Sequence, residues 1–233
     1  MCDDPEDAAA LMRDLADDAR VIELYKGYGT GIRVGLARVG GRTVGLVAND
    51  HQVDAGRMTS QDCRKAARFV RLCDCYQIPV ISLVNTDGLA VPLAAHQGAL
   101  LRGAAELIYA YAEATSPKVA VFTGNAVGAA YVAMGGKSIA DMSYAWPTAV
   151  ISPLTREAAV QTLDGDKLNA GESRDALEAD YADVYGALNA AKAGVVDDVI
   201  EPKETRKYII AALELLASKH DVNLPKKHGN LPL

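Results

Sequence analysis

Residues 117–134 constrain the fold most, because an apolar run there gives way to a series of very small side chains. Residues 119–122, bounded by Pro117 and Gly124, predict a short buried strand. Five of the seven residues from 124 to 130 are Gly or Ala, and the residues after them can carry a helix. A strand that leads into a helix through small side chains leaves backbone N–H groups uncovered, and such a turn can hold an oxyanion. Close packing of a helix on a sheet is the simpler explanation of the same residues.

The order of strand, loop and helix occurs three times, with a spacing of about 35 to 40 residues, which predicts stacked right-handed crossovers. Glycines 40 and 41 lie between two strand-like runs and predict a hairpin, and Thr59 or Ser60 can cap the helix that follows. We predict strands at residues 32–39, 42–48, 80–84 and 119–122, with helices after residue 59, over 100–111 and after 128.

The remaining elements follow from turn residues and apolar spacing. No linker divides the chain, so we expect one domain over residues 1–233. We predict a short helix within 3–18, an extended run over 143–151, an exposed loop over 163–172, a long helix over 172–192, a strand at 195–200 and a last helix at 203–219.

Composition excludes several classes of protein. The net charge is −6 and no basic stripe occurs, which argues against nucleic acid as a partner. No apolar run approaches the roughly 18 residues of a membrane span, and the first residues do not resemble a signal peptide, so we expect a cytoplasmic protein. The cysteines and histidines lack the spacing of metal ligands, so we expect no metal site, and free thiols that are buried or half-buried.

Six segments of the chain together carry a resemblance to a known family. They are residues 44–49 (VGLVAN), 65–71 (KAARFVR), 109–115 (YAYAEAT), 128–134 (GAAYVAM), 144–149 (YAWPTA) and 225–233 (PKKHGNLPL). They resemble the carboxyltransferase subunits of biotin-dependent acyl-CoA carboxylases and the related decarboxylases, such as methylmalonyl-CoA decarboxylase. The resemblance runs from about residue 17 to residue 233 and matches only the C-terminal half of that family.

The resemblance implies an α/β crotonase-like fold, a superhelix of repeated strand-strand-helix turns in a single domain. It implies that backbone N–H groups of Gly128, Ala129 and Ala130 form an oxyanion hole for the biotin carbonyl. It also implies acyl-CoA as substrate, biotin on a separate carrier protein, a partner chain with the N-terminal half of the carboxyltransferase, and a homo-oligomer. The biotin-binding residues that it implies are Gly88, Leu89, Ala129, Ala130, Tyr131 and Val132.

Several departures from the family pattern cluster at this expected site. Residues 128–131 read GAAY where the family usually has Gly-Gly-Ala-Tyr, and Val132 stands where carboxylases that discriminate acyl chains tend to have Asp. Residues 85–89 read NTDGL where the family has Asp-Val-Pro-Gly-Phe, and residues 96–99 read HQGA instead of Glu-His-Gly-Gly. Either the substrate differs or catalysis is reduced.

The sequence therefore leaves three candidate functions to consider. The first is the biotin-facing half of an acyl-CoA carboxyltransferase or decarboxylase; the second is a non-catalytic assembly subunit on a crotonase scaffold. A hydratase or hydrolase acting alone is disfavoured because an acid/base carboxylate pair is missing. Of the single residues, Asp87 is most simply a turn former before Gly88, His96 a capping or surface residue, and Trp146 a core residue.

Overall fold

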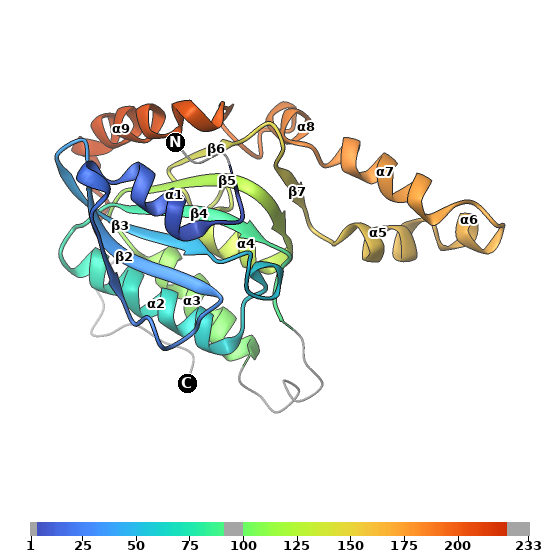
Figure 1. Cartoon of the computed structure of the whole chain (residues 1–233), viewed down its shortest axis with the longest axis horizontal. Coiled ribbons are helices and arrows are strands. Elements are labelled where there is room, and N and C mark those ends of the chain that lie inside the picture. Colours follow the sequence, from blue (N-terminus) through green and yellow to red (C-terminus); the bar gives the residue numbers. More distant parts are fainter. Residues whose placement is uncertain (1–3, 91–99, 223–233) are drawn as a thin grey trace.

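The computed structural model describes residues 4–90 and 100–222, which form a single α/β domain around a mixed sheet of eight strands (Figure 1). The strands lie in the order β1-β2-β3-β4-β5-β6-β8, and β7 pairs with β5 beyond the end of β6. Their bounds are β1 Val21–Leu24, β2 Ile32–Val39, β3 Arg42–Asn49, β4 Val80–Thr86, β5 Lys118–Val127, β6 Met142–Ala145, β7 Val150–Ser152 and β8 Asp198–Val199.

The predicted hairpin is confirmed. β2 and β3 pair antiparallel around Gly40 and Gly41, which have φ values of 59° and 79°, a backbone conformation that glycine adopts without strain. β1 adds a third antiparallel strand at the edge of the sheet.

From β3 to β8 the sheet is parallel, and its central strands are covered on both faces. Every residue of β4 is buried, because the strand has helices above and below it. The predicted alternation of strands and helices, and with it the crotonase-like α/β fold, is confirmed.

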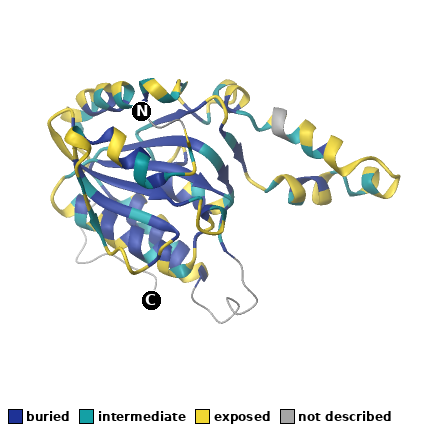
Figure 2. Ribbon diagram, viewed as in Figure 1, coloured by how far each residue is buried: buried dark blue, intermediate teal, exposed yellow. Residues whose placement is uncertain are grey.

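Two apolar cores flank the sheet. Figure 1 shows helices on both faces of the sheet, and Figure 2 marks most of its strands as buried. The helices α2, α3 and α4 pack on one face, and α1 and α9 pack on the other. Trp146 is buried in the second core and donates to Thr205 Oγ1 at 2.9 Å, which confirms it as a core residue. These helices span α1 Ala8–Leu15, α2 Ser60–Cys75, α3 Leu100–Glu113, α4 Gly128–Gly135 and α9 Thr205–Leu215, and short 3-10 turns span Asp17–Ala19, Asp54–Gly56, Pro202–Glu204 and Leu216–Ser218.

Three predictions about the strands need correction. The small residues 124–127 are not a loop but the end of β5, because that strand keeps pairing with β4 and gains β7 as a neighbour. The extended run over 143–151 is split into β6 and β7, which pair with successive parts of β5. The strand predicted at 195–200 is reduced to β8.

The region after β7 departs most from the sequence prediction. Residues 163–172 contain α6 Gly165–Asn169 instead of forming a loop, and the helix predicted over 172–192 is broken into α7 Arg174–Val184 and α8 Ala187–Lys192. The break has a tertiary cause: the Ile151 N–H donates to the Tyr185 carbonyl at 2.9 Å, and Val150 bridges to Gly186. Together with α5 Arg156–Leu163, α6 and α7 project from the body as an arm, residues 156–184 (Figure 1).

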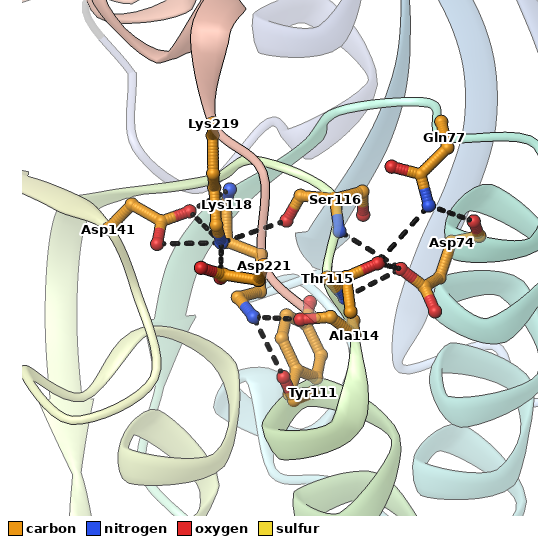
Figure 3. A network of polar contacts seen from close by, with 10 residues as sticks. All are labelled: Asp74, Gln77, Tyr111, Ala114, Thr115, Ser116, Lys118, Asp141, Lys219 and Asp221. Atoms are coloured by element: carbon orange, nitrogen blue, oxygen red, sulfur yellow. Dashed lines mark hydrogen bonds and ion pairs between the residues drawn. The ribbon is translucent and has the colours of Figure 1, made fainter. Parts of the chain in front are cut away.

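A polar network joins the amino ends of β4 and β5 to the segment after α9 (Figure 3). Lys219 Nζ lies 2.8 and 2.9 Å from the two carboxylate oxygens of Asp141, and Asp141 Oδ2 accepts from the Lys118 N–H at 2.7 Å. Burial alone would lower the pKa of Lys219, but the contacts with Asp141 and Asp221 outweigh it and raise the pKa. Burial lowers the pKa of Lys118, whose ammonium donates to the carbonyls of Tyr111 and Ala114 at the end of α3.

The three thiols within residues 4–90 and 100–222 are free as expected, although the exposure of one of them differs from the prediction. Cys63 and Cys73 are buried, and burial raises the pKa of each thiol to about 12. Cys75 is exposed, because it lies on the opposite side of α2.

Candidate functional site

The site begins where β5 passes into α4. Val127 is the N-cap residue of α4 and has extended backbone angles, φ −114° and ψ 137°, but its apolar side chain cannot accept a hydrogen bond from the first turn. Gly128 follows with φ 64°, and a Cβ atom placed there would meet only the Pro153 carbonyl oxygen, at 3.8 Å. The prediction that Gly128 opens a helix is confirmed, and this helix starts without a side-chain cap.

The loop after β4 lies beside this junction. A Cβ atom on Gly88, which has φ 108°, would lie 3.5 Å from the Val127 carbonyl oxygen. The structure therefore brings two of the predicted site segments together. The Gly88 N–H is already used, because it donates to Thr86 Oγ1 at 3.0 Å, and Leu89 bridges to Met58 and packs partly on the first core.

The predicted residues of α4 point in different directions. Ala129 and Val132 are exposed, whereas Ala130 is 1% exposed and belongs to the first core. Tyr131 is half-buried, and its ring meets Phe122 edge-on with centroids 6.0 Å apart. Of the α4 side chains, those of Ala129 and Val132 thus face outward, while Ala130 can contribute through its backbone only.

A row of asparagines crosses the carboxyl ends of β3, β4 and β5. Asn49 Oδ1 accepts from the Asn85 N–H at 3.2 Å, and Asn85 Oδ1 accepts from the Asn125 N–H at 2.9 Å. Asn125 Nδ2 then donates to Asp87 Oδ1 at 2.7 Å. Gly124 makes room for this row, because a Cβ there would lie 2.5 Å from Asn85 Oδ1.

A pocket of about 160 Å³ opens between these strand ends and the start of the arm. Asp87, Asn125 and Val127 form one wall, and Arg156, Glu157 and Glu178 of the arm contribute charged groups to the other. A larger cavity of about 530 Å³ lies over β1 and β2 near Ile22 and Leu36, away from α4. The smaller pocket adjoins the predicted site, because Asp87 and Val127 in its lining directly precede Gly88 and Gly128.

Comparisons with known proteins show the family of this chain. Residues 2–231 match the model of the carboxyl transferase domain family. The chain is a carboxyl transferase family member. It is 38% identical over 235 residues to the carboxyltransferase subunit of propionyl-CoA carboxylase from Haloferax mediterranei, covering 98% of this chain and 46% of that protein. It is 40% identical to the acetyl-/propionyl-coenzyme A carboxylase beta5 subunit of Mycobacterium leprae, covering 98% of this chain and 44% of that one.

The crystal structure of transcarboxylase 12S superposes with a TM-score of 0.92 at 36% identity, over 100% of this chain and 46% of the other. The carboxyl transferase chain thus spans about half the length of the relatives it matches, and the match corresponds to their C-terminal half. The resemblance predicted from the six sequence segments is confirmed, although residues 225–233 and His96 lie outside the part that the structure describes.

Some features of this candidate site are not evident from the sequence. Asn125 falls in the predicted small-residue loop, although an asparagine among Gly and Ala is a signal of polar contacts. Arg156 and Glu157 carried no signal, because only the path of the arm brings them to the pocket. Within residues 4–90 and 100–222, no group of three or more His, Cys, Asp or Glu could hold a metal ion, and no helix has the length and apolar character to cross a membrane.

Proposed function

We propose that this chain is the biotin-facing half of an acyl-CoA carboxyltransferase or decarboxylase, which moves a carboxyl group between an acyl-CoA and carrier-bound biotin. The observation that carries the proposal is the uncapped start of α4 at Gly128, beside a pocket and next to Gly88. The first turn of a helix presents backbone N–H groups and a partial positive charge, and here no described side chain caps it.

The residues at this junction fit a planar carbonyl compound such as the ureido ring of biotin. Gly128 leaves open space, and the exposed Ala129 carries only a methyl group. The pocket of about 160 Å³ is smaller than the roughly 300–1,000 Å³ of sites that enclose a drug-sized ligand. It can take a ring or head group, which leaves the rest of the substrates to a second chain.

When bound, biotin supplies a ureido nitrogen that gives up or accepts the carboxyl group while its carbonyl oxygen gains negative charge. The backbone N–H groups of residues 128–130 stabilise that charge without any titrating side chain. Val127 keeps these donors available because it offers no competing acceptor. Gly88 leaves room for a ligand to approach the start of α4, because no side chain at this position covers the Val127 carbonyl.

The other substrate and the partners follow from the relatives. Transcarboxylase 12S is a hexamer that binds methylmalonyl-coenzyme A in a multienzyme core. Because this chain matches only about half of such proteins, we propose that a partner chain supplies the N-terminal half, that a biotin carrier protein delivers the biotin, and that the assembly is oligomeric.

The test is reconstitution. The chain would be purified alone and together with a partner chain that matches the other half of the relatives. Transfer would be followed as loss of the carboxyl group from methylmalonyl-CoA and malonyl-CoA, with biotin methyl ester as acceptor. We expect transfer from the pair and none from either chain alone. A stable pair that transfers nothing from either thioester would reject the proposal.

A non-catalytic assembly subunit is the second candidate, favoured by the extra methyl of Ala129 and the altered residues 85–89. It predicts that the pair forms normally and that this chain is needed only to hold the complex together. Variants that close the start of α4 would then leave every activity of the complex unchanged.

A further inference from the structure

Asp87 does not form the turn that its position before Gly88 suggests. The Thr86 hydroxyl closes that turn on both sides: it accepts from the Gly88 N–H at 3.0 Å and lies 3.1 Å from the Gly88 carbonyl. The carboxylate of Asp87 reaches instead across to β5, where Asn125 Nδ2 donates to its Oδ1 at 2.7 Å. Its contact is therefore with the neighbouring strand and not with its own turn.

This carboxylate is held in a defined place. The Asn125 backbone is tied to Asn85, and the Asp87 N–H donates to the Ala55 carbonyl at 3.2 Å. Among residues 4–90 and 100–222, no group donates to Asp87 Oδ2, and the side chain lines the pocket beside Val127. A fixed carboxylate oxygen thus lies available in the wall next to the start of α4.

The charge of the pocket indicates which ligand group this oxygen would accept. Among the described residues that line the pocket, Asp87, Glu157 and Glu178 outnumber the one cation, Arg156, so this wall favours a hydrogen-bond donor over an anion. The backbone N–H groups at the start of α4 instead favour a ligand group that accepts hydrogen bonds. A ligand that fits both must carry an acceptor and a donor side by side.

A cyclic urea has this arrangement, because its carbonyl lies between two N–H groups. We infer that Asp87 accepts a hydrogen bond from the ureido N–H that does not carry the carboxyl group, while the carbonyl faces α4. This inference rests on the proposed function and adds a residue that orients the ring. The family pattern has proline where this chain has Asp87, so the contact would be particular to this chain and relatives that share the carboxylate.

The test measures binding as well as turnover. With the reconstituted pair, the dissociation constant of biotin methyl ester would be measured by calorimetry for wild type, Asp87→Ala, Asp87→Asn and the control Glu214→Gln, an exposed carboxylate on α9 outside the pocket. Loss of a hydrogen bond to a charged group should raise the dissociation constant about 10- to 100-fold in Asp87→Ala. Asp87→Asn keeps a neutral acceptor and should lose less affinity, and Glu214→Gln should change the dissociation constant less than about threefold. Melting temperatures identify variants that fail to fold.

A biotin ester methylated at the non-reacting nitrogen provides the second measurement. It should bind wild type as weakly as biotin methyl ester binds Asp87→Ala, and the two changes together should add no further loss. Equal affinity of folded Asp87→Ala and wild type for biotin methyl ester would overturn the inference while carboxyl transfer persists. Absence of both binding and transfer in the wild-type pair would instead reject the proposed function itself.

Discussion

Helices α2 and α4 both follow strands of the parallel part of the sheet, but their first turns differ. The first turn of α2 is capped by side chains, and that of α4 is not. At α2, the Thr59 hydroxyl accepts from the Asp62 N–H at 3.3 Å, and the Asp62 carboxylate accepts from the N–H groups of Thr59 and Gly31 at 2.8 and 2.9 Å. At α4, the N-cap residue is Val127 and no side chain caps the turn.

This difference in capping distinguishes a structural helix start from a candidate functional one, although both follow a strand of the sheet. The turn of α2 is capped by the Thr59 hydroxyl and the buried Asp62 carboxylate, and these groups serve stability. The first turn of α4 lacks the stabilisation of a side-chain cap, and its N-cap residue, Val127, lines a pocket. Ligand sites in parallel sheets lie at the carboxyl ends of strands, where both helices start, but only one of the two starts is open.

The largest effect on stability is expected from breaking the closed turn. Asp62→Ala removes the acceptor of the Thr59 and Gly31 N–H groups at a residue that is 1% exposed. The free energy of unfolding should fall by about 3 kcal/mol, while carboxyl transfer per folded molecule stays unchanged. Urea denaturation measures the first, and transfer by the reconstituted pair measures the second. Asp62→Asn keeps one acceptor and should lose less; a loss of transfer without a loss of stability would contradict the assignment.

The next effect comes from the buried alanine of the open turn. Ala130→Leu forces extra volume into the first core, which should lower the free energy of unfolding by about 2 kcal/mol. Ala130→Leu tests packing rather than the approach to the site, because the Ala130 side chain is buried whereas that of Ala129 is exposed. Thermal melting of the variant would show the loss. An unchanged melting temperature would mean that Ala130 is not in the core.

Adding a side-chain cap to the first turn of α4 should make it resemble the capped turn of α2. Val127→Thr keeps the shape of the side chain and offers a hydroxyl that can accept from the first turn of α4. Stability should change by less than about 1 kcal/mol, and carboxyl transfer should fall about tenfold, because one donor is occupied. Steady-state kinetics on the pair gives the result. Full activity together with a hydroxyl seated on the α4 turn in a crystal structure would argue against these donors.

The smallest effect is expected at the amino ends of the strands, where Figure 3 shows charges paired with one another. Lys219→Met should lower the free energy of unfolding by about 1 kcal/mol at neutral pH. Since the folded pKa of Lys219 is raised, its contribution is full below the unfolded value of 10.5 and is lost as the pH rises through the folded pKa. The difference between wild type and variant should therefore shrink above pH 10.5 in denaturation experiments. A difference that stays constant there would contradict the ion pair.

Local chemistry made much of the body predictable. The glycine pair of the hairpin, the Thr59 cap and the apolar spacing of α2 each act over a few residues, so each can be read from the chain. The helix start in the candidate site was predictable to the same extent, because the small residues at 128–130 indicated it. What a short window cannot show is which alanine faces inward, and here Ala130 does while Ala129 does not.

The remaining errors come from contacts between distant residues. The break between α7 and α8 depends on the bond from Ile151 to Tyr185. The pairing of β4 with β5 shifts so that Val84 lies opposite Phe122 and Thr86 opposite Ala126, in the stretch that holds the Asp87–Asn125 contact. Neither the hydrogen bond from Ile151 to Tyr185 nor the register of β4 with β5 can be predicted from a local sequence pattern.

Turnover of Ala129→Leu tests the central claim most directly. Ala129 is exposed on α4, so a leucine there blocks the approach of a carbonyl to the N–H groups without entering the core. With the partner chain present, carboxyl transfer should fall about 100-fold or more at an unchanged melting temperature. The matched control Ala112→Leu, at an exposed position of α3, should transfer normally. Wild-type turnover in folded Ala129→Leu would remove the start of α4 from the mechanism.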